Sequence, residues 1–395
     1  MDPVRNPYSP NAGAPPPALV GRDGILEAFS VALRRSKAGR SQKSILPTGL
    51  RGVGKTVLLN HFVEDARRLG FSVAQMEASD SESFLSSLAA EARSALYQLN
   101  PRSRMQGLIS KALGVLKSFT LTFGIADLSV ELGVDAERGL GDSGILSNDL
   151  SALFVAVAQA ARDEQSAVLI AIDELQYLNE EQFAAIIMSI HRVNQLSLPL
   201  LLAGTGLPQL PALAGTAKSY AERLFDFPIV GPLSRDEAFE AVRDPAERED
   251  VKIEERALAR LFDVTQGYPY FIQEWAYGVW NLAKKSPILY QEVIAAEPGV
   301  VARLDESFFR VRFDRLTPRE KTYLRAMAEL GPGPHRSGDI ATVLGVRVES
   351  TSPLRSGLIR KGMIYSPQHG DTAFTVPLFD EFMRRAVPVL ERPRR

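Results

Sequence analysis

The feature that most constrains this chain is the run from Gly49 to Thr56, Gly-Leu-Arg-Gly-Val-Gly-Lys-Thr. It satisfies each fixed position of the phosphate-binding pattern G-x-x-x-x-G-K-[ST], the P-loop. Glycines let the backbone turn so that successive N–H groups point into one concavity, where they hold phosphate oxygens. The Lys55 ammonium is expected to reach the β- and γ-phosphates, and the Thr56 hydroxyl to bind Mg²⁺. The sequence therefore predicts a site for ATP or ADP with Mg²⁺.

The residues around this run favour a P-loop over a chance glycine-rich turn. A short apolar segment, 44–46, precedes it and predicts a strand, which should end at Leu46 because Pro47 has no N–H to donate. An amphipathic helix is predicted from Thr56 to Arg68, and its positive N-terminal dipole would face the same anion. The predicted nucleotide contacts are Gly49, Arg51, Gly52, Val53, Gly54, Lys55, Thr56 and Val57.

An acidic pair follows a second apolar segment. Residues 167–172 form a continuous apolar run, as a strand buried on both faces of a parallel sheet requires, and Asp173 and Glu174 come directly after it. This end of a parallel strand is where ligands bind in open α/β sheets. We predict that Asp173 helps to hold Mg²⁺ and that Glu174 orients and polarises the attacking water. The alternative is an ordinary strand exit with two solvated carboxylates.

Two further side chains are candidates for a role in hydrolysis. Thr205 stands in the Gly-Thr-Gly turn after a predicted strand at 198–203, where its hydroxyl could read the γ-phosphate or fix the attacking water. Alternatively, the turn has no chemical role. Arg223 lies near the end of a short helix at 219–224. It could act as an arginine finger on the nucleotide of a neighbouring subunit in a homo-oligomer, or it could be a solvated side chain.

Composition narrows the class of protein. The chain has 395 residues, of which 45% are hydrophobic, so it can form two or three domains with a large core. Its net charge of −1 gives no global attraction to nucleic acid or membrane, and the absence of cysteine excludes disulfides and thiolate metal sites. Neither a signal-peptide run nor an apolar stretch long enough for a membrane span is present, so we expect a cytoplasmic location without a membrane partner.

Four segments are predicted along the chain. Residues 1–19, rich in proline, read as an extended N-terminal arm, and residues 20–231 as a P-loop ATPase core built on a parallel sheet. Residues 232–310 read as a helical lid. Residues 311–395 form the last segment.

An insert in the core spans about 100–146. Within it, 120–125 and 128–134 alternate with period two, which predicts a β-hairpin. The hairpin would be apolar and almost uncharged, which favours an oligomer contact or a protein partner over DNA for this insert.

The last segment has the pattern of a winged helix-turn-helix, with three predicted helices followed by two short strands. From residue 316 to the end, 13 Lys and Arg outnumber 8 Asp and Glu, which favours DNA as a partner. The predicted DNA contacts, in or just before the third helix, are Arg347, Ser352, Arg355, Ser356 and Arg360. The alternative is a module that docks protein or dimerises.

The order of P-loop, acidic strand end, Gly-Thr-Gly turn, helical lid and winged helix resembles the AAA+/STAND group of P-loop ATPases. It is most similar to archaeal-type ATPases and the origin-recognition initiator family. The resemblance implies an α/β P-loop NTPase fold with a helical lid and a winged-helix domain, and ATP hydrolysis.

The resemblance also implies residue roles. It places Val20, Gly21 and Arg22 near the adenine and makes Thr205 the sensor residue and Arg223 the finger. Pro269, in Gly267-Tyr268-Pro269, would contact the nucleotide. The chain departs from the initiators in one respect, because residues 267–274 lack the lid arginine and follow the Gly-x-Pro pattern of the STAND side.

Two functions remain open at this point. In the first, the nucleotide state controls a winged helix that binds DNA, as in an initiator or loader. In the second, a STAND-like signalling switch, the winged helix is a protein-docking or autoinhibitory module. A P-loop kinase is disfavoured because Glu174 suits water better than an acceptor hydroxyl.

Overall fold

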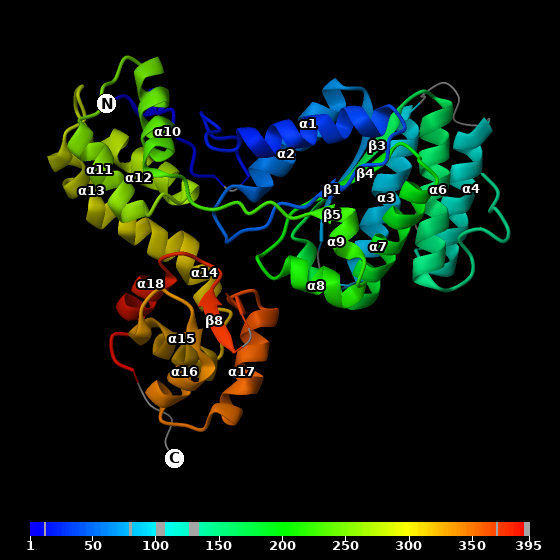
Figure 1. Ribbon diagram of the computed structural model, residues 1–395. Coiled ribbons are helices and arrows are strands. Elements are labelled where there is room, and N and C mark those ends of the chain that lie inside the picture. The colour runs from blue at the N-terminus through cyan, green and yellow to red at the C-terminus, as the bar shows by residue number, and fades with distance from the viewer. Residues whose placement is uncertain (12, 79–80, 100–106, 126–133, 369, 391–395) are drawn as a thin grey trace. The chain divides into compact units, whose positions relative to one another are not determined.

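The chain forms two compact units in a computed structural model (Figure 1). We call residues 22–48 and 55–229 the sheet unit, and residues 1–21, 49–54 and 230–395 the helical unit. The residues described are 1–11, 13–78, 81–99, 107–125, 134–368 and 370–390. No helix within these ranges is long and apolar enough to cross a membrane.

The sheet unit is built on a five-stranded parallel sheet in the order β2-β3-β4-β1-β5. Its strands are β1 (Ser44–Ile45), β2 (Phe71–Glu77), β3 (Ala167–Asp173), β4 (Leu200–Gly204) and β5 (Phe225–Asp226). Every residue of β3 before Asp173 is buried, which explains its unbroken apolar sequence. The predicted parallel α/β sheet of a P-loop NTPase is confirmed.

Helices cover both faces of this sheet (Figure 1). One face carries α1 (Asp23–Lys37) and α2 (Lys55–Arg68), and the other carries α3 (Ser81–Leu99), α6 (Leu146–Asp163) and α7 (Glu180–Gln195). The remaining elements of the unit are α4 (Gly107–Thr122), η2 (Leu175–Tyr177), α8 (Leu210–Ala217) and α9 (Ala221–Leu224). The main apolar cluster lies on the face that α3, α6 and α7 cover, and on the other face α1 and α2 bury side chains such as Phe29 and Phe62.

The insert differs from its prediction. Thr120 to Thr122 form the last turn of α4, so the first strand of the predicted β-hairpin is wrong, and residues 126–133 lie outside the described ranges. The helix ends at Thr122, and the φ of 71° at Gly124 allows the Ile125 N–H to donate to the Thr120 carbonyl at 2.8 Å. The apolar face of α4 packs on α6, and this helical burial outweighs a short alternation of period two.

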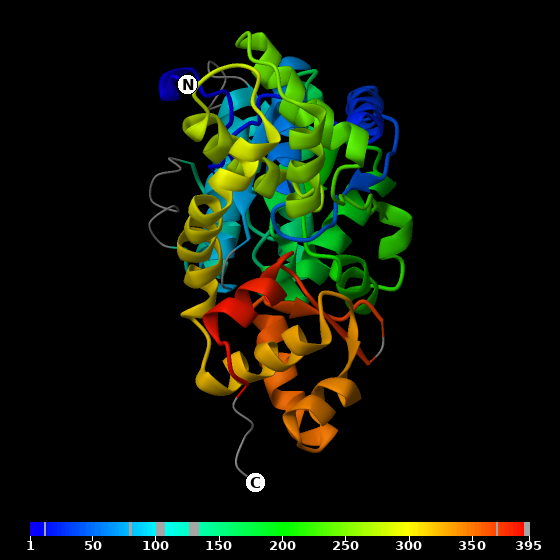
Figure 2. The same cartoon turned by 90° about the vertical axis from the view of Figure 1, so that its left-hand side faces the viewer.

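In the helical unit, the segment that follows the sheet unit in the chain consists mainly of helices. They are α10 (Arg235–Arg248), α11 (Glu255–Thr265), α12 (Pro269–Leu282) and α13 (Tyr290–Arg303). Ser234 and Glu237 form a capping box at the start of α10. Helix α13 continues without a break through a π-helical segment, η3 (Leu304–Phe309), into α14 (Arg310–Phe313), as Figure 2 shows in yellow.

The C-terminal domain of this unit combines four helices with a small sheet. Its elements are α15 (Pro318–Leu330), β6 (His335–Arg336), α16 (Ser337–Leu344), α17 (Val348–Arg360), β7 (Ile364–Tyr365), β8 (Asp371–Phe374) and α18 (Phe379–Ala386). The strands pair antiparallel in the order β6-β8-β7. The β7–β8 pair agrees with the two strands expected from sequence, whereas the two-residue β6 gave no signal.

The N-terminal arm packs against the helices of its own unit. Tyr8 is 3% exposed, and its hydroxyl donates to the Val242 carbonyl at 2.6 Å. The indole N–H of Trp280 donates to the Asp2 carbonyl at 3.0 Å, and the amide of Asn6 donates to the Tyr277 carbonyl at 3.1 Å. These three hydrogen bonds tie the arm to α10 and α12, so the arm is part of the folded unit.

This packing predicts graded losses of stability. Tyr8→Phe removes one buried hydrogen bond and should cost about 1 kcal/mol, whereas Tyr8→Ala also leaves a cavity and should cost about 3 to 5 kcal/mol. Both tryptophans of the chain lie in α12, so tryptophan fluorescence during urea unfolding reports on this unit. Equal stability of Tyr8→Ala and the wild type would show that the arm is not anchored.

Candidate functional site

The loop before α2 has the backbone that phosphate binding needs. Gly52 and Gly54 have φ values of 80° and 91°, which favour glycine. Gly49 has no room for a side chain, because a Cβ there would lie 2.2 Å from the Val230 carbonyl oxygen. Sequence spacing alone therefore identified a loop that requires its glycines for steric reasons.

Helix α2 begins at the end of this loop and presents the two polar residues of the motif. The Lys55 side chain is buried, with 6% of the residue exposed, and Thr56 is exposed. The Thr56 hydroxyl donates to Oδ2 of Asp173 at 2.6 Å. Residues 117 positions apart in the chain are thus brought into direct contact within the sheet unit.

The other oxygen of Asp173 is also engaged. Its Oδ1 accepts the hydroxyl of Thr205 and, at 2.9 Å, the backbone N–H of Glu174. Thr205 is fully buried, and its backbone N–H donates to the Ile172 carbonyl at 3.0 Å. The C-terminal ends of β3 and β4 therefore bring together the predicted metal residues and the predicted sensor threonine.

Glu174 adopts a left-handed backbone conformation with φ of 55°, which turns the chain sharply after β3. Its carboxylate accepts a hydrogen bond from the side-chain amide of Gln176, and the amide oxygen of Gln176 accepts the Leu207 N–H at 3.0 Å. Gln176 was not predicted. Its position just after the acidic pair was the available signal, and it steadies both Glu174 and the turn after β4.

In the helical unit, the loop contacts two segments that sequence reasoning did not connect to it. The Tyr270 N–H, next to Pro269 at the start of α12, donates to the Gly52 carbonyl at 3.1 Å. The Arg51 N–H donates to the Thr375 carbonyl, just after β8, at 2.9 Å. The contact of Pro269 with the nucleotide stays a prediction, while Tyr270 and Thr375 are residues that were not predicted.

The Tyr270 ring is held in a partly apolar setting. It stacks on Phe308 with ring centroids 4.5 Å apart. Burial raises the pKa of the Tyr270 hydroxyl to about 12, and the nearby carboxylate of Glu274 acts in the same direction. The phenol therefore stays neutral at physiological pH.

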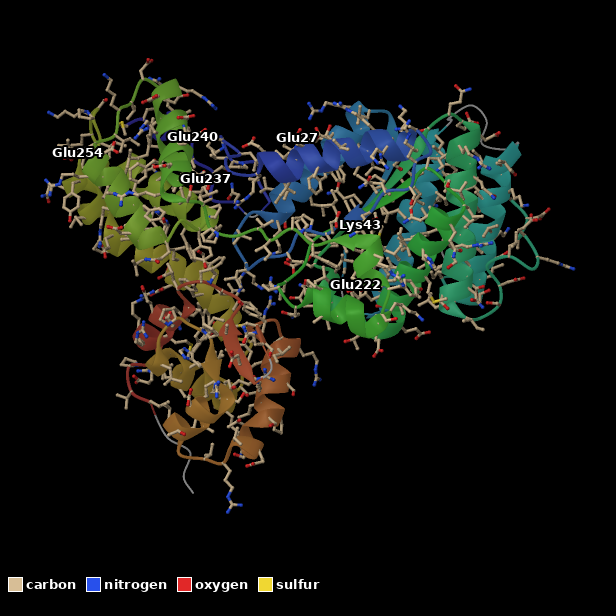
Figure 3. The ribbon with its side chains drawn as sticks, in the orientation of Figure 1. Glu27, Lys43, Glu222, Glu237, Glu240 and Glu254 are labelled. Atoms are coloured by element: carbon tan, nitrogen blue, oxygen red, sulfur yellow. The ribbon has the colours of Figure 1, made fainter. Side chains whose placement is uncertain are left out.

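Of the residues expected near the adenine, Val20 and Gly21 belong to the helical unit and Arg22 belongs to the sheet unit. Val20 is half-buried in the helical unit, and Gly21 has φ of 69° with a Cβ position only 2.5 Å from Glu237 Oε1. Glu237, labelled in Figure 3, lies on α10. Arg22 is 9% exposed in the sheet unit, and its carbonyl accepts the Ile25 N–H at 3.0 Å, which opens α1.

The other predicted residues of the sheet unit lie on helices. Val57 is half-buried on α2, while Arg223 is exposed on α9. The segment of Arg223 is fixed by Lys43, whose ammonium donates to the Glu222 carbonyl at 3.3 Å and to Asp226 Oδ1 at 3.1 Å (Figure 3). An exposed arginine on a fixed segment is compatible with both roles considered for it.

Four of the five predicted DNA contacts are exposed in the C-terminal domain, namely Arg347, Ser352, Ser356 and Arg360. Arg355 is instead half-buried, and its guanidinium is engaged within the domain. Its Nε donates to Thr372 Oγ1 at 2.9 Å, and its Nη2 donates to Ser366 Oγ at 2.8 Å. Helix α17 thus turns this side chain toward the small sheet, where it links helix and strands.

The donor set at the end of β3 suits Mg²⁺. Thr56 and Asp173 supply hydroxyl and carboxylate oxygens, which Mg²⁺ prefers together with water and phosphate oxygens. Within the described ranges, no group of three or more His, Cys, Asp or Glu side chains forms a metal cage. A metal here would therefore depend on the nucleotide for part of its coordination.

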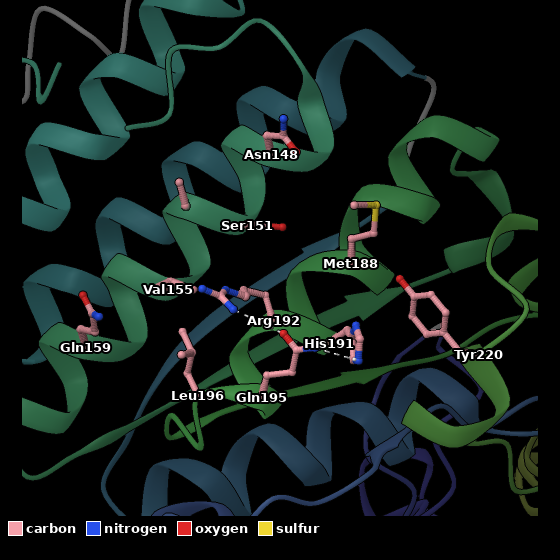
Figure 4. A pocket seen from close by; sticks show the side chains of 11 residues that line it. Asn148, Ser151, Val155, Gln159, Met188, His191, Arg192, Gln195, Leu196 and Tyr220 are labelled. Atoms are coloured by element: carbon pink, nitrogen blue, oxygen red, sulfur yellow. Dashed lines mark hydrogen bonds between the residues drawn. The ribbon is translucent and has the colours of Figure 1, made fainter. Parts of the chain in front are cut away.

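A separate open groove of about 650 Å³ lies on the sheet unit between α6, α7 and the segment before α9 (Figure 4). Both polar and apolar side chains line it, and the rings of His191 and Tyr220 lie 4.8 Å apart. None of the residues that line it is a predicted site residue, so it is distinct from the candidate nucleotide site.

The steric role of Gly49 can be tested directly. Gly49→Ala would place a methyl group against a backbone oxygen and should destabilise the fold by about 1 to 3 kcal/mol. Gly215→Ala is a matched control, because this α8 position is open and alanine favours helix by about 1 kcal/mol. In thermal unfolding, only Gly49→Ala should have a lower midpoint than the wild type. A Gly49→Ala midpoint equal to that of the wild type would contradict the loop geometry.

Comparisons with known proteins agree with this geometry. Residues 18–203 match a family model described as an AAA ATPase domain, and residues 306–383 match a domain of unknown function. A search of curated proteins finds no match.

Among solved structures, the Walker-type ATPase of Pyrococcus abyssi shares 17% identity, with a TM-score of 0.54 and coverage of 93% of this chain and 96% of that one. The Aeropyrum pernix ORC1 protein in complex with DNA shares 14% identity, with coverage of 97% and 96% and a TM-score of 0.47. The Thermotoga maritima RuvB Holliday junction branch migration motor shares 16% identity, with coverage of 95% of this chain and 96% of that one and a TM-score of 0.45. Only the first score exceeds 0.5, and at such identity it speaks for the fold alone. The family match, the P-loop and the parallel sheet thus agree in making residues 18–203 similar to an AAA ATPase domain.

Proposed function

We propose that the chain binds ATP with Mg²⁺ at the P-loop, hydrolyses it, and uses the nucleotide state to control its C-terminal domain. The observation that carries this proposal is the contact between Thr56 and Asp173, with Thr205 on the second oxygen of the same carboxylate. Hydroxyl and carboxylate are the two protein ligands that a Mg²⁺–triphosphate needs, and they meet here without rearrangement of the sheet.

Binding would depend on the loop and on α2. The backbone N–H groups of 49–54 are the donors for phosphate oxygens, and Lys55 supplies a positive charge from the first turn of α2. Because Lys55 is largely buried, its interaction with a phosphate would be weakly screened by solvent. A bound Mg²⁺ would neutralise phosphate charge.

Hydrolysis would depend on Glu174. Its carboxylate can accept a proton from water, and Gln176 holds it by a hydrogen bond after the tight turn at φ of 55°. Thr205, fixed by its backbone and by Asp173, would report whether a γ-phosphate is present. Exposed Arg223 would complete the site of a second copy in a homo-oligomer, and the insert at about 100–146 would offer a protein contact.

We further propose that residues 311–395 are a winged-helix domain that binds DNA. The order of helices and strands, with β7 and β8 antiparallel after α17, supports this assignment. Arg347 and Arg360 are exposed at the two ends of α17 and would meet phosphates, whereas Arg355 is bound within the domain. The other segments would be the arm at 1–19, the ATPase core at 20–231 and the lid at 232–310.

A second candidate function has one observation in its favour. The Arg51 N–H, an amide of the P-loop, donates to the Thr375 carbonyl of the C-terminal domain. In a STAND-like switch, such a contact would hold the domain against the loop until nucleotide binding released it for a protein partner. DNA titration separates the two functions.

The role of Glu174 gives a sharp test of hydrolysis. Glu174→Gln keeps the size of the side chain but removes the base, so ATP binding should be retained while turnover falls by about 10²- to 10⁴-fold. Glu180→Gln, an exposed position in the first turn of α7, is the control and should hydrolyse like the wild type. Phosphate release and nucleotide binding are measured on the same samples. Wild-type turnover in Glu174→Gln would remove this residue from the mechanism.

DNA binding is tested by the two exposed arginines of α17 and its N-cap. The double variant Arg347→Ala, Arg360→Ala should weaken binding to duplex DNA and lower the salt slope by about two. Lys284→Ala with Lys285→Ala removes the same charge from exposed positions outside the C-terminal domain and should leave the slope unchanged. If the wild type shows no salt-dependent DNA binding with ATP, ADP or neither, the protein-docking function is favoured instead.

A further inference from the structure

An unbroken series of aromatic rings runs from the P-loop to the C-terminal domain within the helical unit. It begins at Tyr270, whose N–H donates to the Gly52 carbonyl at 3.1 Å. The approach is close, because a Cβ on Gly52 would lie 3.2 Å from the Tyr270 Cβ. Tyr270 is therefore in direct contact with the loop at Gly52.

The next rings belong to the π-helical segment. Phe308 stacks on Tyr270 with centroids 4.5 Å apart and planes at 24°, and it meets Phe309 edge to face at 5.2 Å. Phe309 stacks on Phe382 of α18 at 5.2 Å and 22°. Stacked and edge-to-face pairs at these distances stabilise one relative orientation beyond the area that they bury. The series thus links the start of α12 to α18 through two consecutive phenylalanines.

The two phenylalanines lie in the π-helical segment Leu304–Phe309, where Phe308 stacks on Tyr270 and Phe309 stacks on Phe382. The turn is wider than an α-helical turn, and such segments occur mainly as local insertions in α-helices, often at functional sites. Both rings are buried, at 9% and 1% exposure, and Arg312 lies over the outer face of Phe308 at 4.3 Å. The segment is therefore held by packing.

A second path returns from the C-terminal domain to the loop. Phe379 lies next to Phe309 at 5.9 Å and next to Phe374 at 5.8 Å. Phe374 is followed by Thr375, whose carbonyl accepts the Arg51 N–H at 2.9 Å. Loop, α12, the π segment, α18 and the end of β8 thus form a closed cycle of contacts.

We propose that this aromatic series transmits nucleotide occupancy from the P-loop to β8 and α18, and that Tyr270 is the positioning residue at its start. The inference rests on the proposed nucleotide binding, whose phosphates would engage the same loop backbone that Tyr270 and Thr375 contact. A shift of Gly52 or Arg51 would move both ends of the cycle together. The chain would then need no charged residue in the lid to sense the nucleotide.

The test measures amide hydrogen exchange across residues 371–386 of the full chain, with and without Mg·ADP and a non-hydrolysable Mg·ATP analogue. In the wild type, nucleotide should change exchange there by about tenfold at the most affected amides. Tyr270→Leu keeps the N–H and much of the volume but removes the ring, and it should reduce this nucleotide effect by about fivefold or more. Nucleotide affinity, measured by titration of the same samples, should change by less than about threefold.

Three variants make the result specific. Tyr270→Phe keeps the ring and should behave as the wild type. Tyr290→Leu removes a ring on α13 that lies near Arg256 and outside the series, and it should also retain the full effect. Phe308→Leu removes the ring that stacks on Tyr270, while Phe271 still contacts both Tyr270 and Phe309, so it should reduce the effect. This variant covers the case in which Tyr270→Leu fails to fold.

Two outcomes would overturn the inference while leaving nucleotide binding intact. One is a full nucleotide effect in folded Tyr270→Leu or Phe308→Leu. The other is a wild type that binds nucleotide without any change in exchange at 371–386. A wild type that binds no nucleotide would overturn the proposed function and this inference together, and the binding titration distinguishes that failure from the other two.

Discussion

The candidate site depends on one carboxylate, that of Asp173. It is placed by the end of a fully buried strand, and each of its oxygens is engaged by a hydroxyl from a different element. Thr56 comes from the first turn of α2 and Thr205 from the end of β4, so three neighbouring elements of the sheet unit meet at one group. A hydrogen bond to a carboxylate is stronger than one between neutral groups, which makes this junction a rigid reference point for a bound metal–nucleotide.

Much of this site could be predicted because its residues follow from local rules. Gly49 to Thr56 form a contiguous pattern, and Asp173 follows an apolar run that only a buried parallel strand explains. The capping box of Ser234 and Glu237 is likewise a local signal. The predicted first strand of the β-hairpin was wrong because tertiary packing outweighed a local sequence pattern. Thr120 to Thr122 alternate like a strand, yet they complete α4 because its apolar face is buried against α6.

Residues whose role depends on distant partners gave no signal in the sequence. Arg355 looked like a phosphate contact on an exposed helix face, but Thr372 and Ser366, brought near by the β7–β8 pair, bind its guanidinium. Tyr270 and Thr375 have a role only through hydrogen bonds to the loop, to the Gly52 carbonyl and from the Arg51 N–H respectively. These partners are distant in the sequence. The N-terminal arm was predicted only as extended because proline-rich sequence carries no periodicity, although Tyr8 is buried among helices far along the chain.

The account predicts that Lys55, Thr56 and Asp173 form one Mg–nucleotide site, and calorimetric titration of a non-hydrolysable Mg·ATP analogue into the full chain tests this most directly. The wild type should bind with one nucleotide per chain, and removal of Mg²⁺ with a chelator should weaken binding. Lys55→Ala should lower affinity by at least about tenfold, because it removes a charged donor from a largely buried position. Equal affinity in the wild type and Lys55→Ala, or binding indifferent to Mg²⁺, would contradict the account.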